Sequence, residues 1–204
     1  MKKRLSAKKI AVLMAIIALV SFGYKLTIGI LATSLVMIVA AIPALFVFVC
    51  KVAYAKNMNQ TREEKRRAYF IMAIATASFA AIFVLFSILK VGGIDITNQN
   101  RFEGWIGIIF ILFIILLFVL SIINLKKALG KEDLVLIGIK EITFMSALTD
   151  AVMIQEFLYR VINAYIDVKI PFFDLINKYF PLGVGILMIL IPVSMFRRLM
   201  HYED

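Results

Sequence analysis

The sequence is poor in the residues that build catalytic and metal sites. Its only cysteine is Cys50, which excludes an intramolecular disulfide and a metal site made of several thiolates. Its only histidine is His201, which lies in a polar C-terminal tail. We find no catalytic, metal-binding or nucleotide-binding motif, so we predict neither a catalytic residue, nor a bound metal, nor a cofactor.

Acidic residues are also scarce. The chain has 13 Asp and Glu against 23 Lys and Arg, which gives a net charge of +10. In a soluble protein this excess would suggest nucleic acid or an acidic partner. Here the charges form short clusters between long apolar runs, and no basic face with interleaved aromatic residues is present. We therefore predict the lipid bilayer as the main partner and exclude nucleic acid.

Apolar residues dominate the composition. They make up 63% of the chain, and the mean hydropathy is +0.97. Soluble domains are only about 45–50% apolar, and a helix needs about 20 apolar residues to cross a bilayer. We predict an all-α, polytopic membrane helix bundle in a single domain, 1–204, with about six transmembrane helices. The predicted spans cover residues 10–24, 26–49, 69–89, 105–123, 134–163 and 181–197.

Local signals place several boundaries. Gly23 to Lys25 is predicted to form a tight hairpin between the first two spans. Thr61 and Glu64 have the spacing of a capping box, so the third helix should begin before its apolar run. Pro43 should kink the second span, and Pro181 should lie in the first turn of the last one.

The charges predict an orientation. In the alternating scheme 16 basic residues fall on the side of the N-terminus and six on the other side, with Lys140 inside a helix. Basic residues favour the cytoplasmic side. An even number of spans puts both ends on that side, so we predict a multi-pass protein of a bacterial-type cytoplasmic membrane with both termini in the cytoplasm.

The predicted fifth helix differs from the others. Between Leu134 and Asp167 the chain reads LVLIGIKEITFMSALTDAVMIQEFLYRVINAYID, and polar residues interrupt its apolar pattern. A charge at mid-membrane costs about 2.5–3.5 kcal/mol, so such residues are normally paired, neutral or hydrated. The candidate intramembrane polar site consists of Ser146, Thr149, Asp150, Gln155, Glu156 and Arg160.

The two acids of this helix lead to different expectations. Glu156 and Arg160 have the favourable i, i+4 order and should pair within the helix. Asp150 has no basic residue three or four positions away, and no lysine or arginine is expected in the middle of another span. Asp150 should therefore be protonated, hydrogen-bonded to a serine or threonine of another helix, or beside water.

Three interpretations of the candidate intramembrane polar site remain open. It can line a polar cavity, such as a proton-linked transport path, a channel or a small-ligand site. It can hold helices together, at about 0.6 kcal/mol for each hydrogen bond. It can also lie partly in the membrane interface, with its charges in water.

Two resemblances involve this helix. The run from Gln155 to Arg160 resembles the EExxxR motif of the intramembrane CAAX-protease and bacteriocin-processing family, in which paired glutamates activate a water. Here Gln155 replaces the first glutamate, and no FxxxH motif follows.

The second resemblance extends over the C-terminal half of the chain. Asn124 with two lysines, then Lys140, the run Ser146-Ala147-Leu148 and Gln155 are similar to a pattern in small bacterial six-span membrane proteins of unknown function. This resemblance implies a fold and a location and no activity.

We expect a non-enzymatic membrane component, whose polar fifth helix mediates assembly with a second copy or with a membrane-protein partner. The alternative is a small-solute or proton-linked transporter or channel lined by Asp150, Glu156 and Arg160. An intramembrane hydrolase is the third possibility. The substrate, the partner and the oligomeric state do not follow from the sequence.

Overall fold

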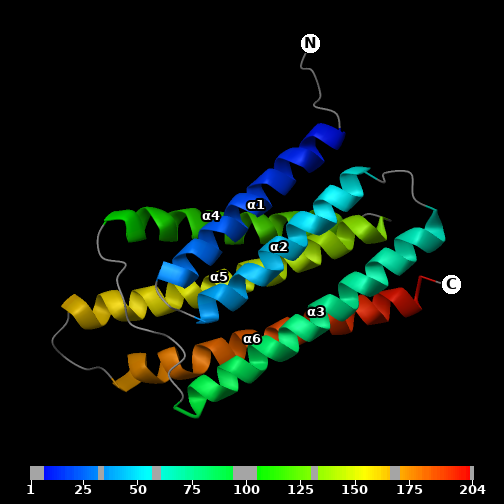
Figure 1. The fold of residues 1–204 in the computed structure, drawn as a ribbon. Helices are drawn as coiled ribbons and strands as arrows, with labels where there is room; N and C mark the ends of the chain where they lie inside the picture. Colours follow the sequence, from blue (N-terminus) through cyan, green and yellow to red (C-terminus); the bar gives the residue numbers. More distant parts are fainter. Residues whose placement is uncertain are drawn as a thin grey trace.

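The computed structural model is all-α, as predicted (Figure 1). It describes residues 7–31, 35–56, 61–93, 105–129, 133–165 and 171–202. The helices are α1 (Ala7–Leu31), α2 (Leu35–Lys56), α3 (Arg62–Val91), α4 (Trp105–Leu129), α5 (Leu134–Tyr165) and α6 (Pro171–Met200). Among the described residues three helical stretches are long and apolar enough to cross a membrane, namely Ile38–Lys56, Arg62–Val91 and Pro171–Met200.

The fifth helix lies at the centre of the arrangement. It packs against α2, α3, α4 and α6, whereas α1 packs on α2 and α4 packs on α5. Helices α3 and α6 form a second long contact beside α5 (Figure 1). Successive helices run in opposite directions, so the first turn of α1 and the last turn of α6 lie toward the same end of the bundle (Figure 1).

Two boundaries differ from the sequence prediction. The hairpin expected at Gly23 to Lys25 is wrong, because α1 continues through these residues to Leu31. The hydroxyl of Thr27 donates to the Gly23 carbonyl at 2.8 Å. Lys25 pairs with an acid inside the bundle, so its ammonium does not need a turn that would place it in water. The last helix begins at Pro171 and not near Pro181, because proline suits the first position of a helix, where its missing N–H is not required.

The predicted capping box is confirmed. The Thr61 side chain accepts a hydrogen bond from the Glu64 N–H at 3.3 Å, and the Glu64 carboxylate accepts one from the Thr61 N–H at 2.8 Å. These two bonds satisfy backbone donors that the first turn of α3 would otherwise leave unpaired. The helix therefore starts at Arg62, seven residues before the apolar run that begins at Tyr69.

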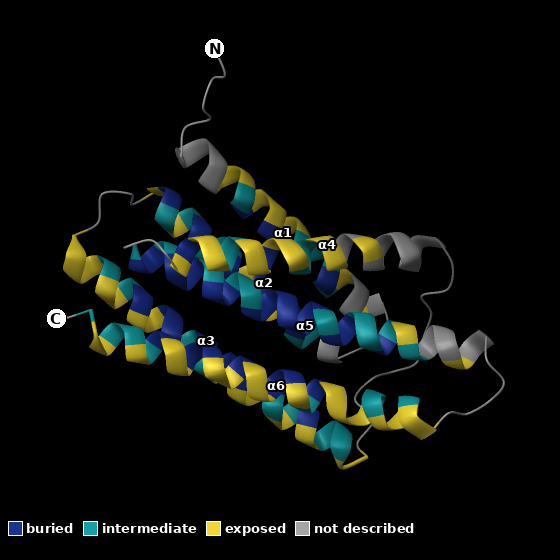
Figure 2. Ribbon diagram, turned by 180° about the vertical axis from the view of Figure 1, so that it is seen from behind, coloured by how far each residue is buried: buried dark blue, intermediate teal, exposed yellow. Residues whose placement is uncertain are grey.

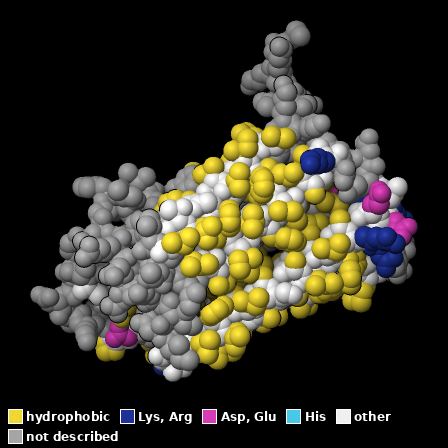
Figure 3. All heavy atoms as spheres, viewed as in Figure 1, with side chains coloured by type: hydrophobic (Ala, Val, Ile, Leu, Met, Phe, Trp, Pro, Cys, Tyr) yellow, Lys and Arg dark blue, Asp and Glu magenta, His cyan; other side chains and the backbone are white. Residues whose placement is uncertain are grey.

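The distribution of polarity is the reverse of that in a water-soluble protein. Lysines are among the side chains least often buried in soluble proteins, yet Lys25 is 2% exposed and Lys51 is 7% exposed. Large apolar side chains point outward instead, including Leu112 and Val20, at 63% and 62% exposure. Exposed residues follow the outer faces of the helices (Figure 2), and apolar side chains cover the visible flank with charges gathered toward its ends (Figure 3). This surface suits contact with lipid.

Helices α3 and α5 approach closely at Gly138. A methyl group added at Gly138 would lie 2.9 Å from Cδ2 of Tyr69 and 3.0 Å from Cε of Met72. Tyr69 is fully buried, so its ring has little room to move. The close contact therefore depends on the absence of a side chain at Gly138.

We expect Gly138→Ala to destabilise the protein by about 1–3 kcal/mol, the usual cost of overpacking a filled core. The measurement is the free energy of unfolding in mixed detergent micelles. Gly23→Ala is the matched control, because nothing lies within 4 Å of a methyl group at that helical position. Equal stability of the two variants would contradict the close packing of α3 on α5.

Candidate functional site

The polar side chains of α5 form three separate clusters, each of which joins α5 to other helices. We name them after their acids: the Glu141 cluster, the Asp150 cluster and the Glu156 cluster. At a rise of 1.5 Å per residue, the first two acids are about 14 Å apart along the helix axis and the last two about 9 Å apart. All three acids are buried, with 3–4% exposure.

The Asp150 cluster joins α5 to α1. Lys25 Nζ lies 2.6 Å from Asp150 Oδ1, and it also donates to the hydroxyl of Ser146 at 3.0 Å. The Thr149 hydroxyl donates to the Ser146 carbonyl at 2.6 Å. The expectation that Asp150 has no basic partner in another helix is therefore wrong, because Lys25 of α1 pairs with this carboxylate.

Lys25 was not predicted as the partner of Asp150 because it was assigned to a hairpin between the first two spans. Once α1 is extended to Leu31, Lys25 becomes an intrahelical lysine and its ammonium must be satisfied inside the bundle. A lysine within the apolar stretch of α1 and acids within the apolar pattern of α5 are the signal that could have suggested such a pair. The sequence alone does not show which acid the lysine reaches.

The Glu141 cluster joins α5 to α3 and α6. Arg198 donates to Glu141 Oε1 at 2.6 Å and to the hydroxyl oxygen of Tyr69 at 2.9 Å, and that hydroxyl donates to Glu141 Oε2 at 2.9 Å. Both carboxylate oxygens are therefore satisfied. Glu141 was not among the candidate site residues, although it interrupts the apolar pattern of the helix just as Asp150 does.

The Glu156 cluster joins α5 to α3 and α6. Lys90 Nζ lies 2.6 Å from Glu156 Oε1, and the Gln155 amide donates to Asn177 Oδ1 at 3.1 Å. The predicted pairing of Glu156 with Arg160 stays a prediction, because the side chain of Arg160 lies outside those that the structure describes. The acid has instead an interhelical partner at the end of α3.

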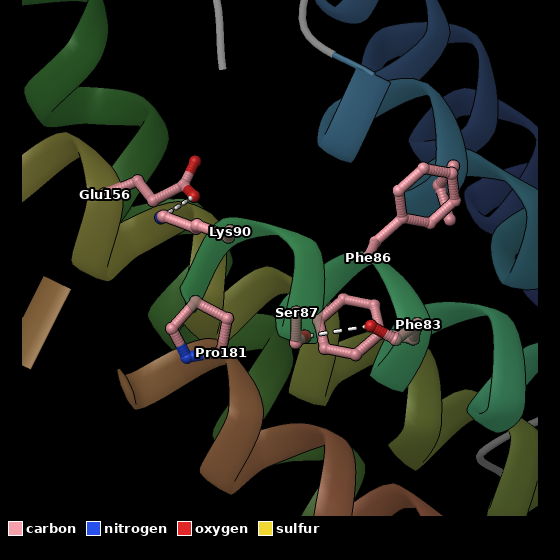
Figure 4. Close-up of a pocket in the computed structure, with 7 residues that line it drawn as sticks. Phe83, Phe86, Ser87, Lys90, Glu156 and Pro181 are labelled. Atoms are coloured by element: carbon pink, nitrogen blue, oxygen red, sulfur yellow. Dashed lines mark hydrogen bonds and ion pairs between the residues drawn. The ribbon is translucent and has the colours of Figure 1, made fainter. Parts of the chain in front are cut away.

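A small cavity adjoins the Glu156 cluster (Figure 4). Its volume is about 20 Å³, and Lys90 and Glu156 form one side of it. Figure 4 shows Lys90 at the end of α3 beside Glu156, with Ser87 and Phe83 on the preceding turns and Pro181 on α6. The cavity is too small for an organic substrate, since one water molecule needs about 10–15 Å³ of such volume.

Apolar layers separate the three clusters. Met145 and Leu148 are buried between Glu141 and Asp150, and Val152 and Met153 are buried between Asp150 and Glu156. A proton or ion path needs polar groups or water within hydrogen-bond distance of one another. In the described part of the bundle the clusters therefore act as separate interhelical contacts.

The residues that the structure describes do not form a metal-binding site. No group of three or more histidine, cysteine, aspartate or glutamate side chains in that part of the chain is arranged to hold an ion. The arrangement offers instead three carboxylates, each neutralised by one lysine or arginine of another helix.

We expect Asp150→Leu to destabilise the protein by about 3–5 kcal/mol, because it leaves the Lys25 ammonium buried without its counter-charge. The double variant Lys25→Met with Asp150→Leu should recover most of this loss, since neither charge remains. Unfolding free energies in mixed micelles test both expectations. Glu63→Gln, which removes an exposed pair with Arg67, is the control and should change stability little. A double variant as unstable as the single one would contradict the pairing.

The chain matches no family model, no curated protein and no solved structure. Its function is therefore inferred from the positions of its own residues.

Proposed function

We propose that the protein is a multi-pass component of a cytoplasmic membrane, with six spans and both termini in the cytoplasm, and that its role is non-enzymatic. The observation that carries this proposal is the inverted polarity of the bundle, with paired charges inside and large apolar side chains outside. In water this distribution would be strongly unfavourable, whereas in lipid it is the expected one.

The lengths of the remaining helices support six spans. Helices α1 and α4 have 25 residues each and α5 has 32, and all three exceed the roughly 20 residues needed to cross a bilayer. Helices α1 and α5 pack beside stretches that qualify by length and apolar composition, and α4 packs on α5. The resemblance to small bacterial six-span membrane proteins agrees with this number.

The orientation rests on the described charges at the two ends of the bundle. Exposed basic residues gather at the end where α3 begins and α4 ends, and these residues are Lys56, Arg62, Arg66, Arg67, Lys126, Lys127 and Arg197. The opposite end has Lys178 as its exposed basic residue among those described. The basic end also holds the first turn of α1 and the last turn of α6, so the positive-inside rule places both in the cytoplasm.

The role of α5 is to assemble the bundle. Each of its three buried acids binds a cation from another helix, and Gln155 adds a hydrogen bond to α6. We expected this helix to mediate contact with a second copy or a partner protein. Because its three buried acids pair with cations of this chain, we propose that a partner binds the outward faces of other helices.

The transporter alternative draws support from one observation, the cavity beside Glu156. The hydrolase alternative has less support. Gln155 is hydrogen-bonded to Asn177 and Glu156 is paired with Lys90, so both residues of the EExxxR-like motif hold helices together in the structure. A hydrolytic mechanism would require Glu156 to be free to activate a water.

The orientation can be tested with single cysteines in a Cys50→Ser background. Asp174→Cys should react in intact cells with a membrane-impermeant thiol reagent, because Asp174 is exposed near the start of α6. Glu63→Cys should react only after the cells are permeabilised. The reverse pattern would contradict the orientation, and labelling of both positions in intact cells would contradict the membrane location.

The non-transport role can be tested in proteoliposomes that contain a pH-sensitive dye. We expect proton flux no faster than in protein-free liposomes, because apolar layers separate the three charged clusters. If the wild-type protein instead carries protons, and Asp150→Asn and Glu156→Gln abolish that flux while Glu63→Gln does not, the transporter alternative replaces our proposal.

A further inference from the structure

The cavity beside Glu156 lies where four helices meet. Val39 comes from α2, Ser87 and Lys90 from α3, Glu156 from α5 and Pro181 from α6. Its volume of about 20 Å³ limits any occupant to the size of one water molecule. The question is therefore which small species its chemistry favours.

An oxygen acceptor of this site is left without a protein partner. Glu156 Oε1 accepts from Lys90, but Oε2 has no hydrogen-bond partner among the described residues, although Glu156 is only 4% exposed. Ser87 donates its hydroxyl hydrogen to the Phe83 carbonyl at 2.8 Å, so its oxygen is left with the capacity to accept (Figure 4). A buried acceptor without a partner costs about as much as a lost hydrogen bond, so the site favours an occupant that donates.

A proline frees a further acceptor near the site. Proline has no N–H, so Pro43 inside α2 cannot donate to the carbonyl of Val39, a residue that lines the cavity. Backbone carbonyls freed in this way inside membrane proteins are commonly satisfied by neighbouring polar groups or ordered water.

The charges at the site favour a neutral donor over a cation. Lys90 already neutralises Glu156 at a distance of 2.6 Å, so the pair carries no net charge. A metal ion or ammonium ion in the same small cavity would lie close to the Lys90 ammonium, and like charges repel strongly where water is scarce. A water molecule donates two hydrogen bonds without this repulsion.

We propose that the cavity is a binding site for one water molecule, which donates to Glu156 Oε2 and to a second acceptor, Ser87 Oγ or the Val39 carbonyl. Lys90 lies one residue before the end of α3 at Val91, and Gly92 and Gly93 are exposed. The site therefore lies near the end of the bundle where α3 stops. This hydration distinguishes Glu156 from Glu141, whose two oxygens are both satisfied by protein groups.

Hydroxyl-radical footprinting of the purified full-length protein in detergent tests the site, because radicals produced from a bound water oxidise the side chains next to it. Phe83 and Phe79 provide a matched comparison on the same helix. Both are buried, at 4% and 7% exposure, but only Phe83 lines the cavity. We expect Phe83 to be oxidised several-fold faster than Phe79, and equally slow oxidation of the two rings would overturn the proposal.

Variants distinguish bound water from other causes of fast Phe83 oxidation. Glu156→Met removes the main acceptor and should reduce the oxidation of Phe83 to the rate of Phe79. If that variant fails to fold, Ser87→Cys and Thr76→Cys in the Cys50→Ser background replace it, since both hydroxyls are buried on α3 and bond the carbonyl four residues earlier. The thiol at 87 should then react with a small water-soluble reagent and the thiol at 76 should not; equal reactivity would overturn the proposal.

Salt distinguishes water from a cation. Oxidation of Phe83 should be the same in sodium, ammonium and choline chloride at equal ionic strength, because choline is too large for the cavity and a neutral occupant does not depend on the cation. A fall in Phe83 oxidation in sodium or ammonium alone would show that an ion displaces the water, and would overturn the choice of a neutral ligand.

Discussion

The need to neutralise the buried acids of α5 governs this structure. An unpaired charge at the centre of a bilayer costs several kcal/mol, and an ion pair repays that cost only when its geometry is good. Each buried acid of α5 meets this condition with one cation at 2.6 Å from a different part of the chain: Lys25 of α1, Lys90 of α3 and Arg198 of α6. The positions of these helices around α5 are therefore fixed by charge as well as by packing.

The main consequence of these ion pairs is that they fix which helices lie beside α5. In a membrane the lipid tails are as apolar as leucine, so burial of apolar surface does little to select one helix neighbour over another. A buried lysine that must pair with a carboxylate does favour one neighbouring helix over another. Helix α1 illustrates the point, because its extended backbone contact is with α2, and Lys25 provides its charged link to the central helix. Without that pair, α1 would retain its apolar contact with α2 but would lose a fixed orientation toward α5.

The sequence was informative where the signal is local and uninformative where it depends on distant residues. The capping box at Thr61 and the polar character of the fifth helix were visible, because each depends on neighbouring residues in one helix. The partner of Asp150 was not visible, because Lys25 is more than a hundred residues away and a Gly-Tyr-Lys sequence also suits a turn. Glu141 was overlooked for a related reason: its partners Tyr69 and Arg198 lie near the predicted ends of other spans and come together only through tertiary packing.

The same distances constrain how the bundle is built. In the proposed six-span arrangement, Lys25 is made long before Asp150, so α1 would either enter the membrane with an unpaired lysine or remain near the interface until α5 arrives. The first course costs about 2.5–3.5 kcal/mol on insertion scales, and a lysine six residues from the end of α1 can reduce that cost by extending toward the headgroups. The arrival of α5 then supplies Asp150 and Ser146 together, while Glu141 and Glu156 capture Arg198 and Lys90. In that arrangement closure of the bundle is coupled to the insertion of α5, which explains why the helix that carries the three buried acids is also the central one.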